Sequence, residues 1–247
     1  MSKVRRYRSK GDAVKTVSVV IPHYYVEREK NLHEIVKALC SGTVLPIEII
    51  IWCNTELILQ SSVFEFFNDD DRVTSVRFIE SSWNVGCQAR FLAALVARGD
   101  YVLFQDNDVC VRRRTVENLL HRAEPNTVVS LDGYYVPPIG YTMRSRCLGW
   151  HQPRPVSVNL TLGRMELVER KTLLRVLRDF PFGPETEMDD VAFSSACKKN
   201  GVPIFVVPAP DRDFVFVNLP DGGVGLSKGM PPSYVARRDS ASKELGL

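Results

Sequence analysis

Short apolar runs alternate with segments of helical periodicity, and this alternation constrains the fold more than any other feature of the sequence. Residues 16–21 and 47–52 are two nearly uninterrupted runs of β-branched and aliphatic side chains. Between them, residues 32–39 repeat apolar side chains at helical spacing, and Gly42 follows as a stop. Strands that are apolar throughout and separated by a helix predict a parallel sheet with crossover helices on its faces.

The same alternation continues along most of the chain. We expect further elements at the following positions: strands at 73–79, 101–104, 127–131, 156–162, 165–168 and 204–207, and helices at 63–67, 88–98, 115–122, 171–178 and 191–200. Residues 132–155 are rich in Gly, Pro, Tyr and Arg, which predicts a long functional loop. Gly and Pro dominate again from Pro208 onward, which predicts a mobile tail or a lid.

The bulk composition suits one globular α/β domain. The chain has 247 residues with 45% hydrophobic content, and its 32 basic and 29 acidic residues leave a net charge of +3. Such a balance gives little support for a nucleic-acid partner. The basic residues do gather in an N-terminal arm, residues 1–15, which is either a solvated segment or a weak contact with an anionic membrane surface.

Cysteine usage and hydropathy bear on the compartment. The six cysteines are scattered without a CxxC pair, and most of them lie in apolar runs. No apolar segment approaches the roughly 20 residues that span a bilayer, and no signal-type block follows the basic N-terminus. We therefore expect a cytoplasmic protein without a transmembrane segment.

Residues 99–109, GDYVLFQDNDV, carry the clearest chemical signal. A buried strand at 101–104 ends in Asp106 and Asp108, and the carboxyl ends of strands in open α/β sheets face the ligand crevice. Two adjacent carboxylates repel each other unless a positive group lies between them. The pattern indicates a divalent metal site, although Asp-Asn-Asp is also an ordinary turn sequence.

Five blocks in order resemble glycosyltransferase family 2, whose members have the GT-A fold: VSVVIPHYY, EIIIWCNTE, WNVGCQARFLAALVARGDYVLFQDNDV, LGRMELVERKTLL and ETEMDDVAFSSACKKNG. The resemblance covers residues 16–207. It implies a single nucleotide-diphospho-sugar transferase domain, Rossmann-like, with a mixed, mainly parallel central sheet. Within that domain, residues 16–110 form the nucleotide-sugar-binding half and residues 111–207 form the acceptor and catalytic half. Residues 208–247 form the tail.

The resemblance also implies a donor site for a UDP-, GDP- or dTDP-linked sugar. Its positions are these: Pro22, His23 and Tyr25 near the base or ribose, Asn54 and Glu56 at the end of the second strand, Asn84, Gly86 and Arg90 near the phosphates, and Asp106 and Asn107 near the ribose or metal. Asp106 and Asp108 fall on the family's DxD motif, which implies Mn²⁺ or Mg²⁺ as the metal. Such a metal, bound by hard carboxylate oxygens, stabilises the diphosphate leaving group.

The acidic pair Asp189 and Asp190 corresponds to the family's catalytic pair at a helix start. In that alignment Asp190 is the base that takes a proton from the acceptor hydroxyl of a glycan, lipid or protein in an inverting transfer. The same pair is also what a helix N-terminus favours without any catalytic role. The aromatic residues Tyr134, Tyr135, Tyr141 and Trp150 are either loop anchors or a stacking surface for a sugar ring.

The sequence departs from the family pattern in three ways, and the first two keep a second hypothesis open. The position of the acidic base contact holds Asn54, and no histidine follows His151 to complete a metal shell, so Asp211, Asp213 or water would have to serve. There is also no QxxRW block, which argues against a processive synthase. The alternative is a protein of the same fold that binds nucleotide sugars or glycans without turnover. A glycine-rich segment near 222–229, a candidate flap over the donor, fits no phosphate-loop pattern.

Overall fold

The computed structural model describes residues 15–54, 75–183, 188–220, 232–244 and 246, and all structural statements below concern these residues. Glu56, the expected helix at 63–67, most of the basic arm and the glycine-rich segment at 222–229 lie outside them.

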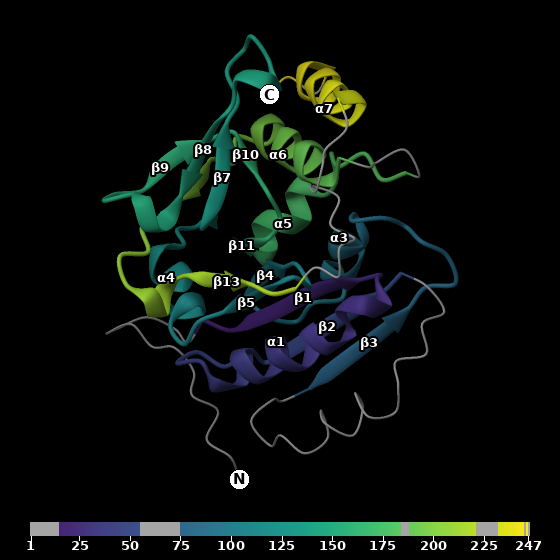
Figure 1. The fold of residues 1–247 in the computed structure, drawn as a ribbon, viewed down its shortest axis with the longest axis vertical. Helices are drawn as coiled ribbons and strands as arrows, with labels where there is room; N and C mark the ends of the chain where they lie inside the picture. Colours follow the sequence, from purple (N-terminus) through teal and green to yellow (C-terminus); the bar gives the residue numbers. More distant parts are fainter. Residues whose placement is uncertain (1–14, 55–74, 184–187, 221–231, 245, 247) are drawn as a thin grey trace.

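An eight-stranded mixed sheet forms the centre of the molecule (Figure 1). Its strands, in spatial order, are β3 (Val76–Glu80), β2 (Glu48–Cys53), β1 (Val17–His23), β4 (Tyr101–Gln105), β11 (Met165–Glu169), β6 (Val128–Ser130), β12 (Ile204–Val206) and β9 (Val156–Val158). The first four are parallel, whereas β11 runs antiparallel to both of its neighbours. The expected α/β class with a mixed, mainly parallel sheet is therefore confirmed.

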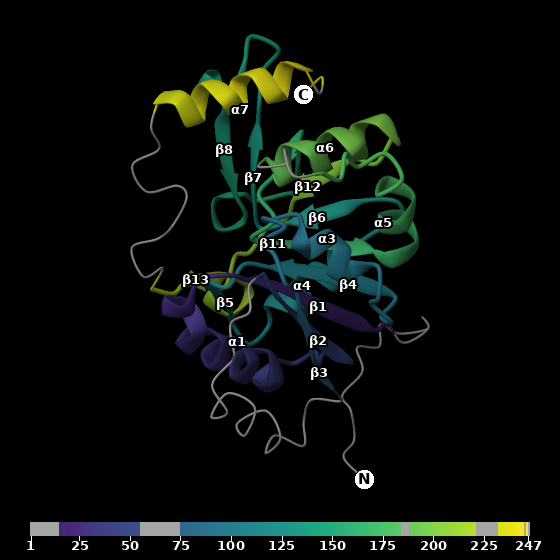
Figure 2. The same cartoon turned by 90° about the vertical axis from the view of Figure 1, so that its right-hand side faces the viewer.

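Helices cover both faces of this sheet, as the uniformly apolar strands require. On one face lie α1 (Glu29–Ser41) and α4 (Thr115–Arg122), whose apolar side chains pack with those of Val19 and Leu103. On the other face, α3 (Ala89–Ala94), α5 (Arg170–Val176) and α6 (Asp189–Lys199) pack with Val20 and Phe104. Figure 2 shows α1 on one side of the strands and α3 and α5 on the other.

Two smaller sheets and four short 3-10 helices complete the fold. The order β10 (Leu160–Thr161), β7 (Asp132–Tyr135), β8 (Ser145–Leu148) forms one sheet, and β13 (Phe216–Asn218) pairs with β5 (Val109–Val111) in the other. The 3-10 helices are η1 (Val26–Arg28), η2 (Tyr141–Met143), η3 (Gly149–His151) and η4 (Arg212–Phe214). A last helix, α7 (Pro232–Glu244), packs on η2 and α6 at the far end of the molecule (Figures 1 and 2).

The expected long loop at 132–155 is wrong in part, because β7 and β8 form an antiparallel hairpin within it. The sequence signal was weak there because few side chains of this hairpin enter the core. Asp132, for example, is buried through ion pairs with Arg146 and Arg164. The single expected strand at 156–162 is two strands, β9 and β10, which belong to different sheets.

Pro22 does not end the first strand, which continues through His23 in register with β2. The pairing of β1 with β4 stops at Val20, so the strand beyond it is paired on one side only and tolerates a proline. The tail after Pro208 is not irregular throughout, since it contributes β13 and α7.

Within the described ranges, no helix combines the length and hydropathy needed to cross a bilayer. All six cysteines lie in those ranges, and none forms a disulfide.

Candidate functional site

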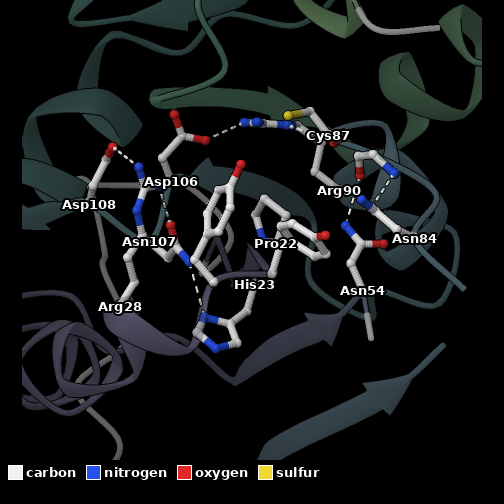
Figure 3. A pocket seen from close by; sticks show the side chains of 13 residues that line it. Pro22, His23, Arg28, Asn54, Asn84, Cys87, Arg90, Asp106, Asn107 and Asp108 are labelled. Atoms are coloured by element: carbon white, nitrogen blue, oxygen red, sulfur yellow. Dashed lines mark hydrogen bonds and ion pairs between the residues drawn. The ribbon is translucent and has the colours of Figure 1, made fainter. Parts of the chain in front are cut away.

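A pocket of about 260 Å³ opens at the carboxyl ends of β1, β2 and β4 (Figure 3). Its walls are formed by the ends of these strands and the segments that follow them: Pro22, His23, Tyr24, Tyr25, Arg28, Asn54, Asn84, Gly86, Cys87, Arg90, Asp106, Asn107 and Asp108. All the expected donor-site residues that the structure describes line this one pocket. The parallel order of β2, β1 and β4 brings them together, since these three strands end at the same edge.

The three residues after β4, Asp106 to Asp108, differ in burial. Asn107 is buried, while the side chains of Asp106 and Asp108 are each 23% exposed. The Asn107 side chain accepts a hydrogen bond from Arg28 Nη1 at 2.8 Å and contacts His23 Nδ1 at 3.0 Å, and Asn31 Nδ2 donates to its backbone carbonyl. Asn107 therefore fixes the turn, and the two carboxylates on either side of it face the pocket.

His23 is neutral at physiological pH. Burial and the nearby Arg28 guanidinium lower its pKa to about 4. Nδ1 of a neutral imidazole accepts the hydrogen bond that the Asn107 amide donates. His23 thus supports the Asp106–Asp108 turn from below and does not supply a charge.

Arg28 is a pocket residue that the sequence did not single out. It lies at the end of η1, 3.3 Å from Asp108 (Nη2 to Oδ2), and its guanidinium stacks over the Tyr25 ring at 5.4 Å. Its spacing in the sequence from Pro22 and from the aspartates does not identify it as a pocket residue. Only the chain path after β1 brings it to the pocket.

Arg90 joins the pocket to α6. Its Nη1 lies 2.9 Å from Asp106 Oδ1 and donates to the Gly163 carbonyl, and its Nε lies 2.9 Å from Asp189 Oδ2. Burial alone would lower the pKa of Arg90, but the two carboxylates raise it well above its ordinary value. The guanidinium is a fixed positive charge between the strand-end carboxylates and the acidic pair.

Asn54 and the loop before α3 form the wall opposite Arg28. The Asn54 side chain donates to the Gly86 carbonyl and accepts from the Val85 amide, so both ends of its amide hold the loop. Asn84 Oδ1 accepts from the Gly86 amide, and Gly86 has φ +72°, a left-handed conformation that glycine adopts without strain. Beside them, burial raises the pKa of the Cys87 thiol to about 12, so this pocket cysteine is not a thiolate.

The acidic pair begins α6, and both side chains are nearly buried. Burial raises the pKa of Asp189 to about 6, against the opposing effect of Arg90. Asp190 points elsewhere: its Oδ1 accepts from the Val191 amide at 2.9 Å, and its Oδ2 accepts from Arg238 Nη2 of α7 at 2.5 Å. The structure therefore connects Asp189 to the pocket through Arg90, whereas Asp190 faces the C-terminal helix.

Glu166 is a second carboxyl group that the sequence did not reveal. It lies on β11 with 1% exposure, on the sheet face that carries α3 and α6, and burial raises its pKa to about 7. Its position inside an alternating strand gave no sign that it approaches Arg90.

The oxygen atoms in the pocket suit a hard divalent cation, because the carboxylates of Asp106 and Asp108 lie on the same side of it. Among the described residues no group of three His, Cys, Asp or Glu side chains is arranged for a metal. Asp211 caps η4, where its side chain accepts from the Asp213 amide, and neither residue lines the pocket. These two residues are not third ligands in this arrangement, so donor phosphates or water would complete the shell.

Comparisons with known proteins agree with this arrangement. The family profile described as Glycosyl transferase family 2 matches residues 18–161. No curated protein sequence matches the chain.

The chain is similar to solved structures of two proteins, and two of these structures contain bound nucleotides or sugars. GalNAc-T7 with UDP, GalNAc and Mn²⁺ aligns with TM-score 0.58 and 15% identity over 78% of this chain and 42% of that one. TarS from S. aureus, residues 1–349, in complex with UDP-GlcNAc aligns with TM-score 0.56 and 18% identity over 78% of this chain and 56% of that one. A further TarS structure gives TM-score 0.55 and 17% identity, over 79% of this chain and 61% of that one. The chain spans about half the length of these neighbours, and the expected GT-A fold is confirmed.

Proposed function

The chain belongs to glycosyl transferase family 2, and we propose that it transfers a sugar from a nucleotide-diphosphate sugar to a hydroxyl group of a glycan, lipid or protein. The observation that carries the proposal is the pocket at the ends of β1, β2 and β4. It gathers Asp106, Asp108 and Arg90 at one mouth, where a diphosphate needs positive charge and a metal needs oxygen ligands.

UDP-linked sugars are the first donors to test, because UDP and UDP-GlcNAc are the nucleotides bound in the structural neighbours. In this proposal Tyr25, Pro22 and Asn54 face the nucleoside, and Arg90 faces the diphosphate. Asp106 and Asp108 would hold Mn²⁺ or Mg²⁺, which when bound supplies Lewis-acid stabilisation of the leaving diphosphate.

The transfer itself would be an inverting substitution. The acceptor oxygen bonds to the anomeric carbon while the bond from that carbon to the phosphate oxygen breaks, and the nucleoside diphosphate leaves with the bonding electrons. Asp190 takes the proton of the acceptor hydroxyl. Its neighbour Asp189 contacts the same Arg90 that lines the donor pocket, which supports a shared reaction centre.

Replacement of Asp190 tests the assignment of the base. We expect Asp190→Asn to lower nucleotide release from the accepted donor by roughly two to four orders of magnitude, with donor affinity retained, because a general base contributes that much. The control is Asp179→Asn, a carboxylate near the other end of α6 that pairs with Lys199. Unchanged turnover in Asp190→Asn would remove Asp190 from this role.

The second candidate function is donor binding without transfer. One observation favours it: the structure engages both oxygens of Asp190, one by Val191 and the other by Arg238. Wild-type protein that binds a nucleotide sugar but releases no nucleotide with any hydroxyl acceptor would support this function and contradict the first.

A further inference from the structure

The C-terminal helix α7 contacts the acidic pair through a buried arginine. In this 13-residue helix the buried residues are Arg238 and Ser242, so a charged side chain supplies much of its inward face. Arg238 is 5% exposed, and its Nη2 donates to Asp190 Oδ2 at 2.5 Å. A buried arginine is costly unless an opposite charge pairs with it, and Asp190 is that charge.

Two aromatic rings enclose this ion pair. The guanidinium of Arg238 lies 4.7 Å from the ring centroid of Tyr141 and 5.9 Å from that of Tyr234. Its Nη1 also contacts the Tyr234 hydroxyl at 3.4 Å. Aromatic faces favour a cation and exclude water, so the rings strengthen the attraction between Arg238 and Asp190.

The loop beneath α7 is shaped to receive it. Gly140 has φ +129°, and a Cβ there would lie 2.3 Å from Asp239 Oδ1. That oxygen accepts a hydrogen bond from the Tyr141 amide at 2.7 Å. Gly140 is therefore required for the close approach of α7, a feature independent of the Arg238 ion pair.

Charged and titratable groups from several elements surround Asp190. They are Asp189 on the same helix, Arg90 beyond it, Cys87 before α3, Tyr141 on η2, and Tyr234 and Arg238 on α7. Arg90 is already paired with Asp106 and Asp189, so among the described residues Arg238 is the cation that pairs directly with Asp190.

We propose that Arg238 is a positioning residue for the transfer reaction: by pairing with Asp190 it holds this carboxylate in one orientation, and α7 must be docked for the base to work. The inference rests on the proposed function, in which Asp190 is the base. Each carboxylate oxygen has two acceptor positions, so the bonds from Val191 and Arg238 leave room for the acceptor hydroxyl.

The test compares Arg238→Gln with Arg238→Lys and with the control Arg237→Gln, an exposed arginine on the same helix. The readout is release of UDP from UDP-GlcNAc with Mn²⁺, measured as kcat and KM. We expect Arg238→Gln to lower kcat roughly tenfold or more, because the Asp190 carboxylate is no longer held in one orientation.

Three further results are expected. Arg238→Lys should recover most of the activity, and Arg237→Gln should match wild type. KM for UDP-GlcNAc should stay unchanged in all of them, since Arg238 does not line the donor pocket. Gly140→Ala, which leaves Arg238 and Asp190 intact but crowds Asp239, should lower kcat in the same way by undocking α7.

Two outcomes would overturn the inference: an unchanged kcat in both Arg238→Gln and Gly140→Ala, or a higher kcat in Arg238→Gln, which would mean that Arg238 blocks the base. Wild-type protein that releases no nucleotide from any nucleotide sugar would instead contradict the proposed function.

Discussion

Arg90 shows how a single side chain can link two parts of a site that are far apart in the sequence. It pairs with Asp106 after β4 and with Asp189 at the start of α6, and it also lines the pocket at the strand ends. Arginine suits this position because its planar fork can engage two carboxylates and keep its charge in a buried setting. The two carboxylates hold Arg90 in place at the wall of the pocket.

Glu166 adds a third carboxyl group near Arg90. The burial that raises its pKa to about 7 outweighs the Thr161 hydroxyl and the Arg90 guanidinium, which both act to lower it. A carboxyl whose pKa is raised in the folded state contributes stability while it is protonated. That contribution is complete below its ordinary pKa of 4.5 and is lost as the pH rises through about 7.

Replacement of Glu166 by Gln should therefore remove a pH-dependent loss of stability. We expect Glu166→Gln and wild type to unfold at similar denaturant concentrations in buffer at or below about pH 4.5, the ordinary pKa of the group. Above neutral pH the variant should be more stable by on the order of 2 kcal/mol. Denaturant unfolding at several pH values measures this, with Glu169→Gln on the same strand as the control. The same difference in stability between Glu166→Gln and wild type at every pH would contradict this explanation.

Among the elements, the strands β1, β2 and β3 are tied together at the edge opposite the pocket by one buried carboxylate. Glu48 of β2 is 0% exposed and accepts hydrogen bonds from the Ser18 hydroxyl, the Arg98 amide and guanidinium, and Arg77. Desolvation acts to raise the pKa of Glu48, but these hydrogen bonds together lower it below its ordinary value. The stability it contributes is present above its ordinary pKa and is lost as the pH falls.

We expect Glu48→Gln to lower the free energy of unfolding at neutral pH by on the order of 2–3 kcal/mol, since several charge-assisted hydrogen bonds are lost in a buried place. The difference from wild type should narrow in acid, where Glu48 protonates. Chemical denaturation at neutral and acidic pH measures both effects, and Glu80→Gln, on an exposed position of β3, is the control. If Glu48→Gln leaves the free energy of unfolding unchanged at both pH values, the hydrogen bonds of Glu48 do not stabilise the sheet.

The elements differ in how well the sequence predicts them, and burial explains the difference. β1, β2 and β4 are buried on both faces, so they are apolar throughout and easily predicted. The helix α7 carries no such signal, because its buried positions are Arg238 and Ser242, residues that are ordinarily exposed. Its role depends on long-range pairing with Asp190, which no local pattern records.

The residues of the site also differ in how well the sequence predicts them. Asp106 and Asp108 follow a predictable strand, so their arrival at one pocket could be inferred from the rule that parallel strands end together. Arg28, Glu166 and Arg238 could not be inferred, because their contacts depend on the tertiary packing of η1, β11 and α7, the last of which packs on α6 and η2. The charges that tune the carboxylates are tertiary features, whereas the carboxylates themselves are visible in the sequence.

At the scale of the whole molecule, the proposed donor pocket lies at the carboxyl ends of β1, β2 and β4, and Arg90 connects it to the acidic pair. Behind the pair, α7 closes the far end of the molecule over α6 and η2 (Figure 2). In the proposed function the first half of the chain binds the nucleotide, α6 supplies the base, and the C-terminal helix orients it.

The most direct test of this account is the binding of UDP-, GDP- and dTDP-sugars, with and without Mn²⁺, to wild type and Asp108→Ala by isothermal titration calorimetry. Asp211→Ala, a carboxylate outside the pocket, is the matched control. We predict that at least one nucleotide sugar binds wild type and Asp211→Ala only with Mn²⁺, and that Asp108→Ala loses at least roughly tenfold in affinity. Binding that needs no metal and persists unchanged in Asp108→Ala would contradict the proposed site.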